Sequence, residues 1–253
     1  MRLLAAILLC WLTSLGAAED RGVSAAETAY AQGDYATAVE QWTEEARVEG
    51  VTAGRLAALG NAEWRLGRKG RAMVCWERAL LLDPRDPVAL AGIRHALNAG
   101  GTERPALTWS ENYAMLLTAD LWLILATAAF WAAFLCVIVP RLRRRPASEG
   151  NHRARMVALT LLALCVPGLW GSRSLSERAV VRKPELALRL TPTQFGEPLD
   201  GVAEGDVVRT GRPFNGHVRV TTAGGKTGWL RAGEIEPVRG NGLPADLDQK
   251  AAP

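Results

Sequence analysis

The sequence has few of the side chains that usually carry catalysis or bind metals. Only three histidines occur among 253 residues, His95, His152 and His217, and they fall in separate segments. No HExxH, GxSxG or CxxC pattern is present, so the common metalloprotease, hydrolase and redox motifs are missing. The sequence therefore predicts a protein that is not an enzyme and that needs no cofactor or metal.

Cysteine is also scarce, and its placement argues against a disulfide framework. Of the four cysteines, Cys10, Cys136 and Cys165 lie in apolar segments, and Cys75 stands alone in the polar region that precedes Cys136. No pair has the spacing of a zinc site or a redox motif. Each cysteine is therefore expected to act as a small apolar residue.

Charge gives no sign of a nucleic-acid partner. The net charge is only +4, and most of the excess sits in one short arginine cluster, which is not a basic face suited to DNA. Gly225-Lys226-Thr227 matches the end of a phosphate-binding loop, but Val220 replaces that loop's first glycine and no helix is expected to follow. We therefore expect no nucleotide ligand, and Ala223–Lys226 is interpreted as a hairpin turn.

Three apolar segments are present. Residues 1–18 have the charged start, apolar run and small final residues of a secretory signal peptide, with a retained anchor as the alternative. Leu121–Val139 contains nineteen residues without a charge, enough for a helix of about 28 Å, close to the hydrocarbon thickness of a bilayer. A third run covers Met156–Trp170. We predict transmembrane helices over 113–139 and 156–172.

An arginine-rich loop, residues 140–155, separates the two predicted spans. Short basic loops stay in the cytoplasm, so both polar regions are expected to face the periplasm from a bacterial inner membrane. A buried soluble hairpin is the alternative interpretation. The arginines that would fix this topology are Arg141, Arg143, Arg144, Arg145, Arg153 and Arg155.

Residues 24–100 contain a repeat. Glycine, alanine and tryptophan recur 34 positions apart, as Gly33 and Gly67, Ala38 and Ala72, and Trp42 and Trp76. A 34-residue helix-turn-helix period is the tetratricopeptide signature. The second unit resembles this family best, and its further matching residues are Leu56, Leu59, Gly60, Ala79 and Pro84.

The resemblance implies two repeats, a capping helix from Pro87 to Leu97 and a concave groove that binds an extended peptide or helix. Asn61 and Arg65 match part of the clamp that some family members use for a carboxylate, whereas Val88 and Gly92 replace its other cations. Solvated or packing roles are the alternative for each groove position. Those positions are Glu27, Tyr30, Asn61, Trp64, Arg65 and His95.

From Val180 the pattern changes to short alternating segments with frequent glycine and proline, which predicts a small β-barrel or sandwich. Residues 178–239 resemble a bacterial SH3-like domain, with Leu188-Arg189 before Pro192 and a glycine turn before Val207-Val208. The resemblance implies a core that includes Val218, Val220, Gly228 and Trp229. Residues 240–253 are expected to form a flexible tail.

The expected fold is thus multidomain: an all-α tetratricopeptide array, two transmembrane helices and a small all-β SH3-like barrel. This order resembles the BatE-type proteins of the Bacteroides aerotolerance operon. The resemblance implies a membrane-anchored scaffold in aerotolerance or envelope stress, beside von Willebrand A-type membrane proteins and indirectly a MoxR-type ATPase. The alternative is a protein that binds peptidoglycan through the SH3-like domain.

Overall fold

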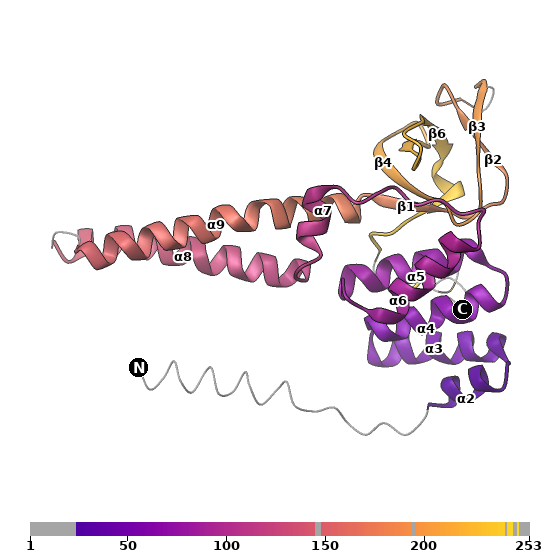
Figure 1. The fold of residues 1–253 in the computed structure, drawn as a ribbon, viewed down its shortest axis with the longest axis horizontal. Coiled ribbons are helices and arrows are strands. Elements are labelled where there is room, and N and C mark those ends of the chain that lie inside the picture. Colours follow the sequence, from indigo (N-terminus) through magenta and orange to yellow (C-terminus); the bar gives the residue numbers. More distant parts are fainter. Residues whose placement is uncertain (1–23, 145–147, 194–195, 241, 245–246, 248–253) are drawn as a thin grey trace.

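The computed structural model describes residues 24–144, 148–193, 196–240, 242–244 and 247. The predicted signal peptide and Arg145 lie outside these residues. Helices come first along the chain, and a β-sheet follows (Figure 1). The helices are α2 (Ala25–Ala31), α3 (Tyr35–Glu49), α4 (Ala53–Arg65), α5 (Lys69–Leu82), α6 (Pro87–Asn98), α7 (Trp109–Ala114), α8 (Ala119–Leu142) and α9 (Glu149–Ser176).

Seven strands form one antiparallel sheet in the order β3-β2-β6-β5-β4-β1-β7. A 3-10 turn, η1 (Ala232–Glu234), precedes the last strand. The strands are β1 (Arg178–Val181), β2 (Leu186–Arg189), β3 (Pro198–Val202), β4 (Val207–Phe214), β5 (His217–Thr221), β6 (Thr227–Arg231) and β7 (Ile235–Pro237).

The sheet does not close, so the predicted barrel is wrong. Closure would require β3 to pair with β7, and these two strands are the edges of the sheet. Pro198 has no amide hydrogen to donate at one edge. At the other edge, Arg78 of α5 donates to the carbonyl oxygens of Pro237 and Val238. The end of β7 is therefore held by a helix and not by β3.

Helices α2 to α6, called the helical region below, pack as successive antiparallel neighbours. The repeat glycines explain the tight turns. Gly33 has φ +82° between α2 and α3, and Gly67 has φ +77° between α4 and α5. A left-handed conformation at these equivalent positions favours glycine over any residue with a Cβ. The 34-residue spacing thus corresponds to the same turn used twice.

Trp76 is the central packing residue of the helical region. Its side chain is 1% exposed and lies between α4 and α6. A Cβ added at Gly60 would lie 2.5 Å from the indole nitrogen of Trp76, and one added at Gly92 would lie 2.4 Å from its Cε2. Both helices therefore approach the indole closely because each presents a glycine to it.

Replacing Gly92 with alanine is expected to force the indole out of place and to lower the free energy of unfolding by about 1–3 kcal/mol. Gly54→Ala is the matched control on α4, because its added Cβ meets nothing within 4 Å. The measurement is urea unfolding of the detergent-solubilised chain, followed by tryptophan fluorescence. Equal midpoints for the two variants would contradict this packing.

Helices α8 and α9 pack against each other as a long hairpin. By length and composition, both are long and apolar enough to cross a membrane. The structure places their boundaries differently from the sequence prediction. The chain breaks between α7 and α8, α8 continues past Pro140 to Leu142, and α9 already begins at Glu149. Much of the predicted 140–155 loop is therefore helical.

The continuation of α8 past Pro140 has a local cause. A proline within a helix leaves the carbonyl four residues earlier without its usual donor, and here that carbonyl belongs to Cys136. The side-chain amide of Asn151, on α9, donates to this oxygen at 2.7 Å. The facing helix thus supplies the hydrogen bond that proline removes.

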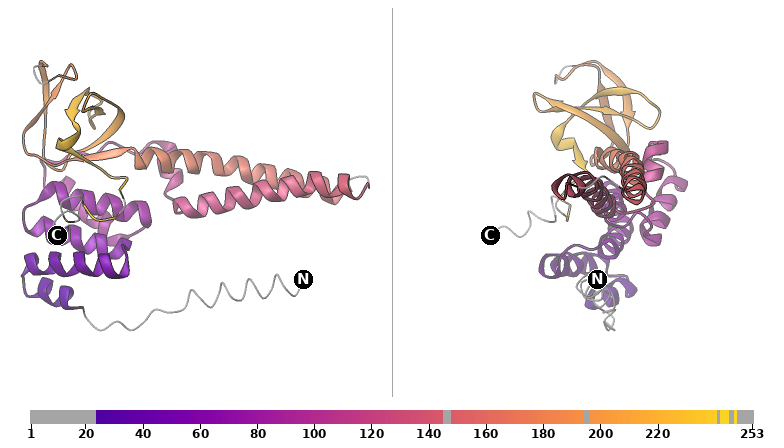
Figure 2. Two further views of the ribbon diagram at one scale, coloured as in Figure 1. Left: turned by 180° about the vertical axis from the view of Figure 1, so that it is seen from behind. Right: turned by 90° about the vertical axis from the view of Figure 1, so that its left-hand side faces the viewer.

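The helical region and the sheet lie together at one end of the hairpin, which projects away from them (Figure 2). They share one apolar cluster: Val180, Val207 and Val238 are buried in contact with helical residues such as Met73. In the expected tail, Leu247 is buried near Trp42, and its carbonyl accepts a hydrogen bond from Arg47. These contacts join regions that the sequence treats as separate modules.

Candidate functional site

Three of the predicted groove residues gather around Trp76. The rings of Trp64 and Trp76 have centroids 5.8 Å apart, and those of Trp64 and His95 are also 5.8 Å apart. The indole N–H of Trp76 donates to Asn61 Oδ1 at 3.2 Å. Because an indole can only donate, this contact assigns the oxygen of the Asn61 amide and leaves its NH₂ group able to bind a peptide carbonyl.

The other predicted groove residues lie elsewhere or act locally. Tyr30 joins a different aromatic cluster, with ring centroids 5.2 Å from Tyr35 and 5.7 Å from Trp42. Glu27 completes the capping box of α2 with Ser24. Arg65 is exposed at the last residue of α4. Of the predicted groove residues, Asn61, Trp64 and His95 therefore lie together, beside the buried Trp76.

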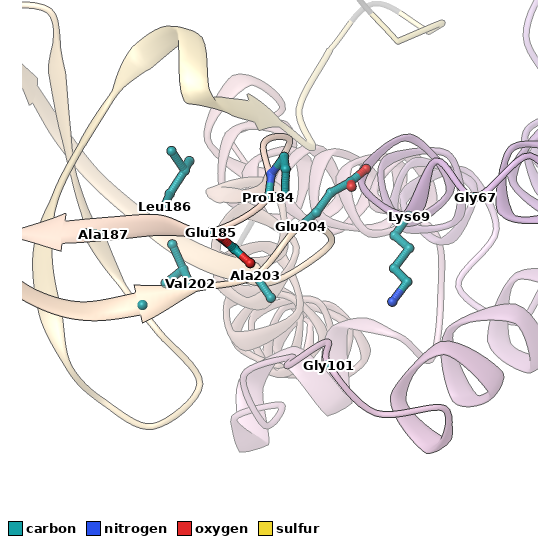
Figure 3. Close-up of a pocket in the computed structure, with 11 residues that line it drawn as sticks. Gly67, Lys69, Gly101, Pro184, Glu185, Leu186, Ala187, Val202, Ala203 and Glu204 are labelled. Atoms are coloured by element: carbon teal, nitrogen blue, oxygen red, sulfur yellow. The ribbon is translucent and has the colours of Figure 1, made fainter.

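A hollow of about 550 Å³ lies between the helical region and the β2–β3 hairpin (Figure 3). Lys69 and Glu185 reach into it, and Leu186, Ala187 and Val202 line the wall that the hairpin forms. Among the described residues that line this hollow there is no histidine, cysteine or serine. Its chemistry suits binding of a segment that carries both apolar and charged side chains.

The wall of this hollow is held by a contact between the two regions. Helix α5 has no side-chain cap of its own at Arg68. The carboxylate of Glu204, in the β3–β4 turn, instead accepts from the Gly70 amide at 3.0 Å. A carboxylate at a helix N-terminus is favoured by the helix dipole. The sheet therefore caps a helix of the helical region.

A buried carboxylate joins the hairpin to the sheet. Glu111 of α7 is fully buried and accepts from the Ser174 hydroxyl on α9 at 2.7 Å. It also accepts from Arg178 of β1 at 2.9 Å and Arg209 of β4 at 3.0 Å. We call these four side chains the Glu111 junction. Four secondary-structure elements meet at one carboxylate.

The charges at the junction are not fully paired. Arg178 is buried completely, and its Nε and Nη1 have no hydrogen-bond partner within the described chain. Burial lowers the pKa of this guanidinium. Nearby, Arg104 binds the buried carboxylate of Glu77 through two nitrogens. Removing one of these charges would leave an opposite charge buried and poorly paired.

The carboxyl group of Glu111 is held in its charged form. Burial favours the neutral form, but this effect is outweighed by hydrogen bonds from the Thr108 amide and the Ser174 hydroxyl and by the charges of Arg178 and Arg209. The net result is a pKa below the ordinary value of a glutamate. The junction is therefore an ionic contact at neutral pH.

The predicted topology arginines that the structure describes lie at the closed end of the hairpin, opposite the helical region and the sheet. Arg141 is in the last turn of α8, and Arg143 and Arg144 follow it. Arg153 and Arg155 lie near the start of α9. The hairpin thus has one strongly basic end and one end that carries both folded regions (Figure 1).

The predicted SH3-like core residues divide between the two faces of the sheet. Val220 is fully buried and Val218 partly buried, on the face that also carries Leu230. Gly228 is buried close to Leu188. Trp229 instead alternates to the other face, where its ring lies 6.4 Å from that of Phe214. Three of the four expected core residues therefore share the inner face.

Sequence reasoning missed the residues that hold the regions together. Thr108 and Glu111 do form a capping box, and the T-x-x-E pattern could have located the start of α7. No local pattern identifies Arg178 or Arg78 as buried. Arg78 pairs with Glu236 of β7 at 2.9 Å, a contact between residues far apart in sequence.

No cluster of three or more metal-binding side chains occurs within the described residues. Comparisons of the chain with protein-family models, with curated proteins and with solved structures give no match. The functional interpretation therefore rests on the geometry of this chain.

Glu111→Gln is expected to lower the free energy of unfolding by about 3–5 kcal/mol, because it leaves buried Arg178 without its counter-charge. The folded-state pKa of Glu111 is lowered, so its carboxylate contributes stability above the unfolded-chain pKa of about 4.3 and loses it as pH falls through the lower folded value. The variant is thus expected to lack this part of the acid transition.

Glu149→Gln is the matched control, since it removes an exposed ion pair with Arg153 and is expected to change stability by less than about 1 kcal/mol. Both variants are compared with the wild type by chemical unfolding between pH 3 and pH 7. A Glu111→Gln variant as stable as the control would show that the junction is not a structural contact of consequence.

Proposed function

We propose that this protein is a non-enzymatic scaffold anchored in the bacterial inner membrane. The observation that carries the proposal is the polarity of the hairpin. Its two apolar helices hold the helical region and the sheet at one end, and the described topology arginines lie at the other end. Basic loops favour the cytoplasmic side, so both folded regions would face the periplasm.

Two features support reading the folded regions as interaction modules. The helical region uses the same left-handed glycine turn twice, 34 residues apart, as expected for tetratricopeptide units. The sheet is a small antiparallel unit with a valine-rich inner face. This fits an SH3-like domain whose edge strands, β3 and β7, do not pair. On this proposal the helices bind a partner, and the sheet braces them at the membrane.

The Asn61, Trp64 and His95 cluster is the proposed contact surface of the helical region. It combines aromatic faces with an amide donor, which suits an extended peptide. The partner class proposed on resemblance is a von Willebrand A-type membrane protein, with a MoxR-type ATPase indirectly attached. A partner in the same membrane would meet the scaffold at raised effective concentration, so weak contacts would suffice.

The topology is tested with alkaline phosphatase fusions, which are active only in the periplasm. Fusions after Gly100 and after Val238 are expected to be active, and a fusion after Glu149 is expected to be inactive. Comparable protein levels are verified by immunoblot. An active fusion at Glu149 would reverse the proposed orientation.

The contact surface is tested by co-purification from crosslinked membranes. A Trp64→Ala/Arg65→Ala double variant is expected to recover less than about a tenth of the partner, because an aromatic anchor is commonly worth 2 kcal/mol or more. Glu44→Ala/Val48→Ala, at exposed positions of α3, is the control. Deleting the sheet is a poorer test, because it would uncover the cluster around Met73.

Unchanged recovery with the double variant would argue against this surface. If purified peptidoglycan sacculi then sediment the wild-type protein, the wall-binding alternative would be favoured.

A further inference from the structure

The outer face of the sheet has an unusual charge pattern. Strands β2, β4, β5 and β6 contain no aspartate or glutamate. The register places Arg219 opposite Trp229, and Trp229 opposite Arg189, so these three side chains form a row across β5, β6 and β2. In antiparallel sheets directly opposed residues share a face. The row therefore consists of an indole between two guanidinium groups.

The same face continues on both sides of this row. Arg231 lies two residues along β6 from Trp229, and Phe214 is opposite His217 on β4 and β5. Phe214 is 61% exposed. The guanidinium groups of Arg219 and Arg231 form no ion pair within the described chain, and the carboxylate of Glu234 accepts a hydrogen bond from the backbone amide of Arg231. We call Arg189, Arg219, Arg231, Phe214 and Trp229 the basic face.

One half of this outer face is covered, and the basic face is the uncovered half. Arg178 and Val180 of β1, and their opposites Arg209 and Val207, lie on the same side of the sheet. Helices cover them: the valines belong to the cluster with Met73, and both arginines bind Glu111 of α7. The basic face therefore lies next to the part of the sheet that α7 covers.

Helix α7 also marks the level at which the apolar hairpin ends. It packs on α9 so closely that a Cβ at Gly171 would lie 2.0 Å from the Ser110 carbonyl oxygen. Trp109 of α7 is 73% exposed, and Trp170 of α9 is 70% exposed. Exposed tryptophans at the end of an apolar helix are typical of the membrane–water interface. The face and the interface thus adjoin at α7.

We propose that the basic face binds the anionic headgroups of phospholipids in the membrane that the hairpin enters. The inference rests on the proposed membrane anchoring. The guanidinium groups of Arg219 and Arg231 would attract phosphate, and the indole of Trp229 with the nearby phenyl ring of Phe214 suits the headgroup region. The continuity of this face with α7 favours the adjacent lipid surface over a distant polymer. Lipid contact would fix the height and tilt of the sheet at the membrane.

The test uses the full chain in nanodiscs of neutral phosphatidylcholine, with or without phosphatidylglycerol. A spin label at Thr227→Cys, an exposed position on the same face, reports collisions with a water-soluble nickel complex. At low salt, we expect the collision rate in anionic discs to be at least about fivefold lower than in neutral discs. Molar salt, which shortens the screening length to about 3 Å, should restore it.

Arg219→Gln/Arg231→Gln is expected to weaken this docking by about 25-fold, since each arginine near an anionic surface contributes about fivefold. Lys183→Gln/Arg239→Gln removes two exposed charges outside these strands and is expected to leave docking unchanged. A midpoint of thermal unfolding equal to that of the wild type in both variants shows that neither is misfolded.

Three results would overturn the inference: equal collision rates in neutral and anionic discs, equal loss of docking in both variants, or shielding of the label by added sacculi but not by phosphatidylglycerol. Incorporation of the chain into neutral discs is measured separately, because it tests only whether the α8–α9 hairpin anchors the protein in a membrane. Incorporation without anionic shielding would leave the proposed scaffold intact and reject lipid binding by the sheet.

Discussion

The arrangement of this protein depends on one buried carboxylate. Glu111 binds a serine of α9 and two arginines of β1 and β4, and it is itself positioned by the capping box of α7. These elements include both the end of the hairpin and the start of the sheet. Since a buried charge without a partner is costly, the contact works only when all of them are in place. This fixes the sheet relative to the hairpin.

The remaining contacts between regions follow the same principle. Arg78 of α5 meets Glu236 of β7 and the carbonyl oxygens that follow it, and Glu204 caps α5 from the sheet side. Valines of the sheet then complete the apolar cluster around Met73 and Trp76. A partner that binds the helical region would therefore bind a body whose orientation to the hairpin is already set.

The sequence predicts local features of this fold well. The repeated turns at Gly33 and Gly67, the close packing on Trp76 and the two apolar helices all have signatures in composition or spacing. Long-range ionic contacts have no such signature. Arg178 sits in a stretch that reads as an ordinary strand, and its burial depends on Glu111, which lies 67 positions away.

Two other differences have specific causes. Pro140 predicts a helix end, but Asn151 of the facing helix supplies the missing hydrogen bond. The alternating pattern after Val180 predicts a barrel, but the sheet stays open. One edge strand, β3, carries Pro198, and the other, β7, is contacted by Arg78 of α5. Among the predicted groove residues, Asn61 and Trp64 lie on α4 and contact Trp76, whereas Tyr30 packs in a different cluster. Sequence spacing cannot distinguish a residue that lies beside Trp76 from one that packs elsewhere, because this depends on the side chains that each residue contacts in the folded protein.

Whether the helices and the sheet form one folded body is tested most directly by excising residues 178–239. Alone, this sheet would expose Val180, Val207 and Val238 and leave Arg178 without Glu111. It is expected to show no cooperative thermal transition by circular dichroism, whereas the full chain in detergent unfolds with the sheet and helical region in a single transition. A cooperative transition of the excised sheet, at the midpoint seen in the full chain, would show that the sheet is an independent module and would contradict the single-body fold.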